Sequence, residues 1–372
     1  MKILYVVNEP WFFLSHRLPI ALAAKQQGDT VHVATRIGIT VKEICDLGFI
    51  HHEIPLSRSG SSIPSELNSL FAIWKLLREV KPDVVHLVTI KPVIYGGIAA
   101  RFTPVKKVVA AVSGLGTLFL SEGAVAASKR KVAISLYRLA LGSKKTTVIL
   151  QNPDDKQLLE NLKIVKSEQT VLIRGSGVDL LDFNFILENL SNKPVVTFAA
   201  RLLFDKGLAE YIEAIKILNK KGLEASYQIV GDLDPGNPTS AKDKDIERWQ
   251  SIPNLTVVGY QKDMAAVFMN SNLVVLPSYR EGLPKVLIEA AACGRAIITT
   301  DVPGCRDAIE ANKTGLLVAA KSSTELACAI ERLIIDADLR VKMGTAGRRL
   351  AEKFFSIEQV VDKHLSIYKQ ID

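Results

Sequence analysis

The stretch LVVLPSYREGLPKVLIEAAACG, residues 273–294, contains both kinds of element that decide the fold of this chain. Its first four residues are valine and leucine, which predicts a strand that is buried on both faces. A loop with Gly282 follows, and Pro284 stands where the first residue of a helix is expected. Gly294 stands where that helix would end. The stretch therefore predicts one strand–loop–helix unit of a parallel α/β sheet.

Apolar runs and amphipathic stretches alternate in the same way along the whole chain. The pattern predicts two consecutive series of βα units and therefore two sheets of parallel strands. In the first series we expect strands at residues 2–8, 30–35, 84–88, 107–112, 147–151 and 170–174, and helices at 18–27, 65–80 and 131–141. In the second we expect strands at 195–199, 226–230, 255–258, 273–276, 296–300 and 315–318, and helices at 208–221, 285–293, 323–336 and 339–354.

The length of 372 residues also favours two domains, because a domain typically has about 150 residues. Residues 179–193 show no strand period, so we place the connection between the domains there. The expected fold class is α/β, with two doubly wound, Rossmann-like domains at residues 1–180 and 190–355 that face each other across a cleft. Sheets of this kind bind ligands at the carboxyl ends of their strands.

Composition places the chain among globular proteins, with 48% hydrophobic and 23% charged residues. The apolar runs are about five residues long, whereas a helix that crosses a bilayer needs about 20. The N-terminus begins with a strand-like run and shows no signal peptide. The four cysteines lack a CxxC spacing, which favours reduced thiols over a metal site or disulfides and indicates a cytosolic setting.

The positive charge is concentrated in one part of the chain. Residues 101–145 contain nine Lys and Arg residues and one acid, which alone equals the net charge of +8. Such an excess favours an anionic partner, namely lipid headgroups, diphosphates or nucleic acid. A solvated basic face gives the same pattern, so composition leaves both interpretations open.

The first expected strand is not followed by the glycine-rich turn of a dinucleotide-binding site. The chain has Asn8-Glu9-Pro10-Trp11-Phe12-Phe13 at this point, where G-x-G-x-x-G would let the backbone approach a pyrophosphate. We therefore expect neither a nicotinamide nor a flavin cofactor, and no other cofactor is indicated.

Two carboxylates accompany the strand–loop–helix unit with which we began. Glu281 lies in the loop, and Glu289 lies more than a turn inside the helix. The helix N-terminus offers free N–H groups and a positive dipole end, which suit a phosphate, while the carboxylates can accept hydrogen bonds from sugar hydroxyls. Two surface glutamates on a helix would give the same spacing, and only the combination with Gly282 and Pro284 favours a ligand.

Two cations are expected at the same edge of the second sheet. Arg201 and Lys206 follow the strand at 195–199, where the cleft is predicted. A guanidinium can bind a phosphate in a bidentate manner and a lysine adds a point charge, so the pair can stabilise the charge on a departing diphosphate. A solvated turn is the other interpretation of such a pair, and Glu281 from the same sheet favours the binding site.

These motifs resemble family 4 of the retaining glycosyltransferases. The resemblance covers nearly the whole chain and is carried by Arg201 with Lys206-Gly207, by Glu281 and Glu289, and by three further motifs. These are Gly175-Ser176-Gly177-Val178-Asp179, Gly231-Asp232 and Asp301-Val302-Pro303-Gly304. The resemblance implies a hexosyltransferase with the GT-B fold, in which a last helix, here about residues 356–372, crosses back to the N-terminal domain.

The resemblance also implies roles for residues of the C-terminal, donor-binding domain. Arg201 and Lys206 would bind the diphosphate of a nucleotide sugar, Glu289 its ribose and Glu281 the transferred sugar. Gly282, Leu283 and Pro284 would line the sugar pocket, with Tyr260 near the base.

The N-terminal domain would bind the acceptor. Ser113-Gly114-Leu115-Gly116-Thr117 and Thr89-Ile90-Lys91-Pro92 resemble the branch that extends polyprenyl-diphosphate-linked sugars for bacterial surface polysaccharide, O-antigen or glycoprotein glycan. This implies acceptor-binding roles for Arg17, Lys91, Gly114 and Gly116, and a catalytic role for His16 beside Glu281. A histidine at the start of a helix is the simpler interpretation of His16. Many relatives carry a Gly-Gly loop after the first strand, and this chain does not.

The expected reaction is retaining transfer from a UDP-sugar by front-face attack, in which no carboxylate acts as a covalent nucleophile. Asp232 and Asp234 have D-x-D spacing, yet Arg201, Lys206 and the helix end already supply positive charge. We therefore expect no metal. Three alternatives are weighed against this reaction: a nucleotide-sugar epimerase of the same fold, a non-catalytic nucleotide-sugar-binding protein, and a nucleic-acid binder, for which no reader motif is present.

A lipid-linked acceptor gives the basic segment a role. Residues 126–141 are expected to form a helix whose Lys129, Arg130, Lys131 and Arg138 face anionic lipid. The cluster of Leu70, Phe71 and Trp74 is a second candidate, with ordinary helix packing as its simpler interpretation. The expected location is the cytoplasm, peripheral on the cytoplasmic face of the inner membrane.

Overall fold

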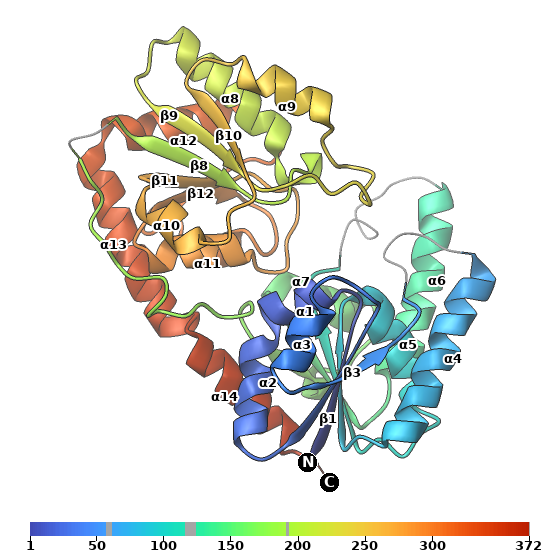
Figure 1. Cartoon of the computed structure of the whole chain (residues 1–372). Coiled ribbons are helices and arrows are strands. Elements are labelled where there is room, and N and C mark those ends of the chain that lie inside the picture. The colour runs from blue at the N-terminus through green and yellow to red at the C-terminus, as the bar shows by residue number, and fades with distance from the viewer. Residues whose placement is uncertain (57–61, 116–123, 191–192, 372) are drawn as a thin grey trace. The chain divides into compact units, whose positions relative to one another are not determined.

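A computed structural model describes residues 1–56, 62–115, 124–190 and 193–371 of the chain. Residues 124–127 and 129 are described by their backbone alone. The chain divides into two compact units (Figure 1). Unit 1 comprises Met1–Ser176 and Glu358–Asp372, and unit 2 comprises Gly177–Ile357. Each unit is built around one sheet of parallel strands with helices on both faces.

Unit 1 contains a seven-stranded parallel sheet with the order β3-β2-β1-β4-β5-β6-β7. The strands are β1 (Lys2–Val7), β2 (Thr30–Thr35), β3 (Ile50–Glu53), β4 (Val84–Val88), β5 (Lys107–Val112), β6 (Thr146–Leu150) and β7 (Thr170–Leu172). The helices are α1 (Pro10–His16), α2 (Leu18–Gln26), α3 (Val41–Asp46), α4 (Ile63–Val80), α5 (Ile90–Ala100), α6 (Ala124–Leu141), α7 (Pro153–Asn161) and α14 (Ile357–Tyr368).

Alternation of side chains along the strands separates two cores in unit 1. Ile3, Tyr5 and Val7 of β1 point to one face, where α2 and α14 cover them. Leu4 and Val6 point to the other face, which α4, α5 and α6 cover. Because both faces are covered, the central strands β1, β4 and β5 are almost entirely buried and mostly apolar, as parallel strands usually are.

Unit 2 contains a six-stranded parallel sheet with the order β10-β9-β8-β11-β12-β13. The strands are β8 (Val195–Ala199), β9 (Ser226–Val230), β10 (Leu255–Gly259), β11 (Leu273–Leu276), β12 (Ala296–Thr300) and β13 (Gly315–Val318). The helices are α8 (Leu208–Lys220), α9 (Asp243–Gln250), α10 (Met264–Met269), α11 (Lys285–Ala292), α12 (Ser323–Ile335) and α13 (Ala337–Phe354).

The chain enters and leaves unit 2 along two hydrogen-bonded segments. The amide of Val178 donates to Phe355 O at 2.8 Å, and the amide of Ile357 donates to Val178 O at 2.9 Å. After this point α14 packs in unit 1, where the hydroxyls of Tyr368 and Tyr5 lie 3.1 Å apart.

Residues 179–193 were expected to connect the two domains, but most of this segment packs on unit 2. Buried Glu188 forms an ion pair with buried Arg340 of α13 at 2.9 Å, and it accepts a hydrogen bond from Asn272 at 2.5 Å. Arg295 donates a further hydrogen bond to the carbonyl of Ile186. The segment lacks strand periodicity because its polar groups are satisfied by these long-range contacts rather than by a sheet.

The expected strands are confirmed to within two residues at either end, and the expected helices lie where the sequence placed them. The largest difference between an expected and an observed helix boundary is at α6, which begins at Ala124 rather than at residue 131. The sequence did not predict β3, α1, α3, α5, α7, α9 and α10. Among these, α5 contains Pro92, Gly96 and Gly97, which lower intrinsic helix propensity. Gly96 and Gly97 are buried there, where the side chain of Leu87 and the backbone of Ala140 leave no room for a Cβ atom.

No helix in the described part of the chain is long and apolar enough to cross a membrane. Cys45, Cys293, Cys305 and Cys328 are free thiols, as the sequence predicted.

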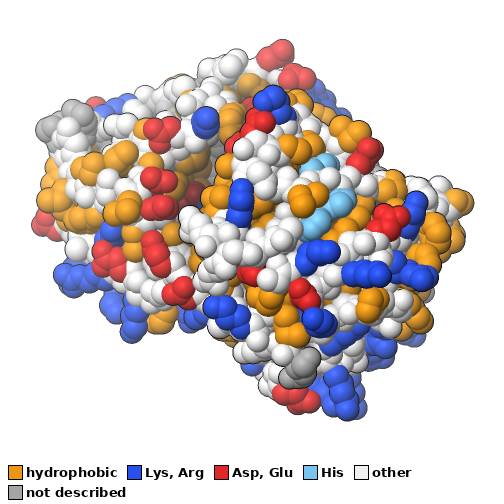
Figure 2. Space-filling view, turned by 60° about the horizontal axis from the view of Figure 1, so that its bottom comes forward, with side chains coloured by type: hydrophobic (Ala, Val, Ile, Leu, Met, Phe, Trp, Pro, Cys, Tyr) orange, Lys and Arg blue, Asp and Glu red, His pale blue; other side chains and the backbone are white. Residues whose placement is uncertain are grey.

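Histidine side chains gather on the face of the molecule that Figure 2 presents. His32 and His52 share a hydrogen bond of 2.8 Å, and burial followed by the charge of His52 lowers the pKa of His32 to about 4.

The buried histidines of unit 1 predict acid sensitivity. His86 and His364 are buried beside Tyr368, whose hydroxyl lies in hydrogen-bond contact with His86 Nδ1. Burial lowers the pKa of His364 to about 3 and that of His86 well below its ordinary value. The folded protein therefore keeps both rings neutral at a pH at which the unfolded chain binds protons. Below about pH 6.5 each ring lowers the free energy of unfolding by up to about 1.4 kcal/mol per pH unit.

We expect His364→Phe to reduce the dependence of unfolding free energy on pH between about pH 6 and 4 by one proton. The control is Tyr368→Phe, which removes the hydroxyl contacts with Tyr5 and His86 but no titrating histidine. It should lower stability without changing the slope. Urea unfolding at several pH values measures both. An unchanged slope in His364→Phe would show that this ring is protonated in the folded state.

Candidate functional site

The loop between β11 and α11 lies at the carboxyl edge of the unit 2 sheet. The four residues of β11 are buried, and the chain then turns through residues 277–284 into α11. Pro284 was expected to be the first residue of this helix and is instead its N-cap residue, one position earlier, and Gly294 follows the helix end with a φ of +74°. The loop therefore places Glu281 before a helix N-terminus, as the sequence predicted.

Glu281 forms an ion pair with Lys206. Lys206 Nζ donates to Glu281 Oε1, and the hydroxyl of Ser278 donates to the same oxygen at 2.8 Å. Both charged side chains are largely buried, with 18% of Lys206 and 14% of Glu281 exposed. Partial burial strengthens the attraction between them relative to an exposed surface pair. Lys206 and Glu281, which the sequence placed in the loops after two different strands, therefore meet in one site.

Two glycines allow the loops around this ion pair to touch. Gly207 has a φ of +77°, and a Cβ atom there would lie 2.1 Å from Pro277 O. Gly304 has a φ of +81°, and a Cβ atom there would lie 2.4 Å from Glu281 O. A side chain at either position would push the Lys206 or Glu281 backbone away, because such distances are far below van der Waals contact.

Arg201 forms an ion pair with Asp234. Arg201 Nη1 lies 2.5 Å from Asp234 Oδ2. The carboxylate is buried whereas 43% of the arginine side chain is exposed. The backbone amide of Asp234 donates a hydrogen bond to Ser240 Oγ at 2.9 Å, which helps to fix the position of Asp234. Asp234 therefore holds an accessible guanidinium at the carboxyl edge of β8.

Glu289 is buried on α11 and lies 3.2 Å from Lys285 Nζ, one turn earlier on the helix. Burial raises the pKa of the Glu289 carboxyl, and Lys285 opposes that shift. A buried carboxylate with one cation nearby can accept hydrogen bonds from a hydroxyl group that replaces water. Its position on the helix is the one expected from the sequence.

The remaining predicted donor residues differ in exposure. Gly282 and Pro284 lie in the same loop, and Leu283 between them is buried in the hydrophobic core of unit 2. Tyr260 directly follows β10, and 68% of it is exposed. The core position of Leu283 anchors the loop, since burial of a leucine side chain contributes about 2 kcal/mol.

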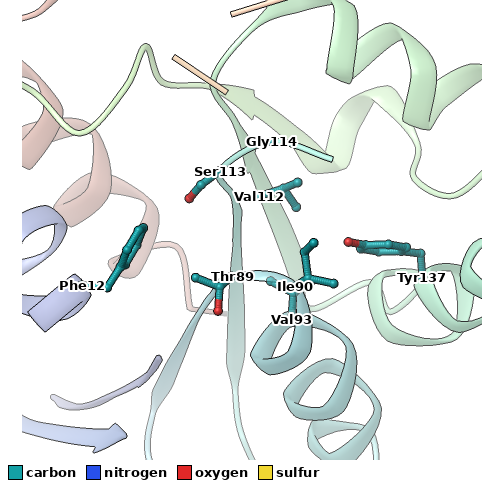
Figure 3. Close-up of a pocket in the computed structure, with 8 residues that line it drawn as sticks. All are labelled: Phe12, Thr89, Ile90, Val93, Val112, Ser113, Gly114 and Tyr137. Carbon is teal, nitrogen blue, oxygen red and sulfur yellow. The ribbon is translucent and has the colours of Figure 1, made fainter. Parts of the chain in front are cut away.

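Unit 1 contains a cavity of about 220 Å³ at the carboxyl ends of β4 and β5, and Gly114 is the one predicted acceptor residue among the described residues that line it. Its walls are Phe12, Thr89, Ile90, Val93, Val112, Ser113, Gly114 and Tyr137 (Figure 3). Phe12 and Tyr137 lie on opposite sides in this view. The ring of His16 stacks on Phe12 at 4.0 Å, and its Nδ1 lies 2.6 Å from the hydroxyl of Ser15. Gly114 therefore lines the cavity, whereas His16 contacts one of its lining residues, Phe12.

Arg17 and Lys91 have different surroundings. Arg17 is 2% exposed and donates to His16 O at 2.8 Å and to Ser176 Oγ at 3.4 Å. Lys91 lies 2.7 Å from Glu66 of α4, which also accepts from the hydroxyl of Tyr95. Neither residue lines the cavity. Gly116 lies outside the described residues.

The two aspartates of the D-x-D motif both contact the loop that follows β8. Asp234 holds Arg201, as above, and the carbonyl of Asp232 accepts from the amide of Leu202 at 2.9 Å. Within the described residues, no group of three or more His, Cys, Asp or Glu side chains is arranged to hold a metal ion.

Sequence reasoning did not identify Asp234 and Ser278 as partners of Arg201 and Glu281. Ser278 is three residues before Glu281, so its place in the loop was a usable signal. Asp234 is 33 residues from Arg201, and only the pairing of β8 with β9 brings them together. Phe12, Thr89, Ser113 and Tyr137 were also missed as cavity residues, because they lie on four separate segments.

Comparison with known proteins agrees with this geometry. Residues 182–350 match the family model of glycosyl transferases group 1, and residues 2–152 match that of glycosyl transferase 4-like domains. The N,N'-diacetylbacillosaminyl-diphospho-undecaprenol alpha-1,3-N-acetylgalactosaminyltransferase of Campylobacter jejuni is 27% identical, and the match covers 96% of this chain and 98% of the relative. The UDP-Gal:alpha-D-GlcNAc-diphosphoundecaprenol alpha-1,3-galactosyltransferase of Escherichia coli is 26% identical, over 85% of this chain and 82% of the relative.

The fold is also that of a solved structure. HepE of Anabaena, solved in complex with UDP and glucose, superposes with a TM-score of 0.77 and 17% identity, over 100% of both chains. Two parallel sheets with these neighbours define a glycosyltransferase of the GT-B fold, an enzyme of the hexosyltransferase class. The chain belongs to the group 1 glycosyl transferase family, with a glycosyl transferase 4-like N-terminal domain. The comparisons do not favour an epimerase or a non-catalytic binding protein.

Proposed function

We propose that this enzyme transfers a hexosyl or N-acetylhexosaminyl group from a UDP-sugar to a polyprenyl-diphosphate-linked sugar, in the assembly of a surface glycan. The observation that carries the proposal is the meeting of Lys206, Glu281 and Ser278 at the carboxyl edge of the unit 2 sheet. The names of the Campylobacter jejuni and Escherichia coli relatives, which both specify undecaprenyl-diphosphate-linked acceptors, support the choice of acceptor.

The donor residues have distinct proposed roles. Arg201 and Lys206 bind the diphosphate, and both exchange a carboxylate partner for phosphate oxygens when the donor enters. Glu289 accepts hydrogen bonds from the ribose, and Glu281 orients the transferred sugar. The N–H groups of Gly282 and of the first turn of α11 add positive potential. Leu283 and Pro284 shape the sugar pocket from the core side, and Tyr260 contacts the base.

We propose that transfer proceeds with retention by front-face attack. The acceptor hydroxyl approaches the anomeric carbon on the side from which the diphosphate leaves, so no protein carboxylate forms a covalent bond. Negative charge grows on the departing diphosphate, and Arg201 and Lys206 stabilise it where it develops. The acceptor proton passes to a leaving phosphate oxygen, with His16 as the assisting base of unit 1.

The acceptor side of the proposal rests on Gly114, which lines the unit 1 cavity, and on His16, which stacks on the lining residue Phe12. Arg17 and Lys91 act in it as positioning residues. Arg17 ties the end of α1 to Ser176, and Lys91 ties α5 to Glu66 of α4. No role is assigned to Gly116.

The direct test of this function is a transfer assay with a panel of UDP- and GDP-sugars, each with and without an α-GlcNAc-diphosphoundecaprenol acceptor. We expect transfer from a UDP-sugar that depends on the lipid-linked acceptor and proceeds without added metal. Isomerisation of the donor sugar without any acceptor would replace this function by that of an epimerase. Nucleotide binding without turnover of any donor would indicate a binding protein.

We further propose that unit 1 attaches to the cytoplasmic face of an anionic membrane through α4 and α6. Ile63, Leu67 and Phe71 recur every four residues on α4 and are exposed. Val132, Leu136 and Leu139 are exposed on α6, next to exposed Lys131 and Arg138. Apolar residues beside cations fit a surface whose headgroups are anionic and whose interior is apolar. Lys129 lies outside the described side chains, and Arg130 is half-buried.

The second candidate cluster divides between core and surface. Leu70 and Trp74 pack against the core of unit 1, and Arg78 covers the Trp74 ring at 4.9 Å. Phe71 is the member that faces solvent, with 59% of it exposed. Only Phe71 of this cluster is therefore assigned to the membrane face.

We expect Lys131→Glu to weaken binding to anionic vesicles roughly 30-fold, because it changes the charge by two and each charge contributes about 1 kcal/mol. The matched control is Lys244→Glu, the same change at an exposed position on α9 of unit 2. Sedimentation with phosphatidylcholine vesicles, with and without phosphatidylglycerol, measures the effect. Equal binding of the wild type to both kinds of vesicle, or to neither, would contradict the proposal.

A further inference from the structure

Buried polar atoms without partners mark the carboxyl edge of the unit 1 sheet. Asn8 Oδ1, Thr89 Oγ1 and Ser113 Oγ are buried and have no hydrogen-bond partner among the described residues. They follow β1, β4 and β5, which are neighbours in the sheet, so the three residues form a row. A buried polar atom without a partner costs about 1–3 kcal/mol, and such atoms are rare in folded proteins unless a ligand satisfies them.

Two members of this row, Thr89 and Ser113, also line the apolar cavity (Figure 3). The other walls are almost entirely hydrocarbon, contributed by Phe12, Ile90, Val93 and the ring of Tyr137 among others. The volume of about 220 Å³ is well above the roughly 15 Å³ of free space that holds one water molecule. Both hydroxyl oxygens are buried in the structure, and another staggered rotamer about the Cα–Cβ bond would turn either one to a group bound in the cavity.

Thr89 has a strained backbone as well. Its φ of +75° and ψ of 165° lie outside the regions that a β-branched residue ordinarily adopts. Strain of this kind costs about 1–3 kcal/mol and is concentrated at binding and catalytic sites. Glycine would relieve it, and the chain has threonine at this position, which suggests a use for the hydroxyl rather than for the turn.

The chemistry of the walls selects one kind of ligand. A hydrocarbon chain would fill the apolar part but leave both hydroxyls unpaired, and a sugar hydroxyl would pair with them but bring no apolar group to the walls. An acetamido group does both, because its carbonyl accepts and its N–H donates a hydrogen bond while its methyl group contacts hydrocarbon. We propose that the cavity binds the acetamido group of the acceptor sugar, with Thr89 and Ser113 as its hydrogen-bond partners.

This inference rests on the proposed function, which supplies a lipid-linked sugar acceptor, and it adds the feature by which that acceptor is selected. Its consequence is a preference for an acceptor with an N-acetyl group over one with a hydroxyl at the same carbon. Each hydrogen bond between hydroxyl and acetamido group corresponds to about a five- to tenfold effect.

The test compares two acceptors that differ only at this group, α-GlcNAc- and α-Glc-diphosphate carried on the same alkyl chain. Binding to the enzyme without donor is measured by titration calorimetry, and kcat/KM is measured with the donor found in the panel assay. We expect the wild type to prefer the GlcNAc acceptor at least tenfold. Ser113→Ala and Thr89→Val should each reduce binding of the GlcNAc acceptor about five- to tenfold and reduce binding of the Glc acceptor by less.

Two further variants serve as controls. Thr89→Ser retains a hydroxyl and should retain the preference, whereas Thr89→Val retains the shape and loses it. Ser135→Ala makes the same change as Ser113→Ala at an exposed position on α6, and it should alter neither acceptor. Thermal unfolding checks that each variant is folded.

The outcomes separate this inference from the function on which it rests. Equal binding of the two acceptors to the wild type, or equal losses for both in the variants, would overturn the acetamido site while transfer to a lipid-linked sugar stands. Binding of neither acceptor, together with no transfer from any donor in the panel, would overturn the proposed function and this inference with it.

Discussion

Lys206→Met is expected to lower kcat for sugar transfer by roughly 100- to 1,000-fold, the range seen when one stabilising donor is removed from a developing anion. Methionine approximates the length of the lysine side chain and removes its charge. The ammonium group lies against Glu281 in a largely buried site, so no neighbouring water replaces it at full strength. Affinity for UDP should fall as well, because the same group binds the diphosphate in the ground state.

The matched control for this variant is Lys216→Met. Lys216 lies on α8, which begins two residues after Lys206, and forms an exposed ion pair with Glu213 at 3.1 Å. Removal of an exposed pair changes stability by well under 1 kcal/mol and should leave kcat unchanged. Steady-state kinetics with saturating acceptor measure both variants. Equal activity of Lys206→Met and Lys216→Met would remove Lys206 from the donor site.

Glu281→Gln is expected to lower kcat about 100-fold without weakening UDP binding. The amide keeps the shape of the carboxylate, and it can still accept the hydrogen bond that Ser278 donates. It does not hold the positively charged Lys206 as a carboxylate does, so Lys206 becomes free to bind the diphosphate. We therefore expect both variants to lower kcat, but only Lys206→Met to weaken UDP binding.

Glu213→Gln is the corresponding control, because it neutralises the acid of an exposed ion pair on α8. Its kcat and UDP affinity should match those of the wild type. Loss of UDP binding in Glu281→Gln together with unchanged kcat among bound molecules would assign Glu281 to the nucleotide rather than to the transferred sugar.

The sequence was sufficient for every strand of the two sheets except β3, and for the positions of Glu281 and Glu289 relative to α11. The strands of unit 2 are short runs of valine, leucine and isoleucine between polar loops, and a run such as Leu273–Leu276 has few alternatives to a buried strand. The loop that follows it contains Gly282 and Pro284, which fix where the helix begins. Glu281 and Glu289 could therefore be placed before and inside α11 from local pattern alone.

Partners of these residues depend on strand order, which local pattern does not encode. Asp234 meets Arg201 only because β9 lies beside β8, and Lys206 meets Glu281 only because β8 lies beside β11. In unit 1, α5 was missed because its glycines lower helix propensity and are present for close packing. The cavity beside α5 was missed for a different reason, because its walls come from segments far apart in sequence.

The proposed function depends most on the binding of the donor diphosphate by Arg201, Lys206 and the loop of Glu281. Titration calorimetry of UDP and GDP against the wild type, Arg201→Ala, Lys206→Met and Lys216→Met tests this claim directly. We expect the wild type and Lys216→Met to bind UDP equally, and Arg201→Ala and Lys206→Met to bind it at least tenfold more weakly. Equal UDP affinity in all four proteins would contradict this expectation.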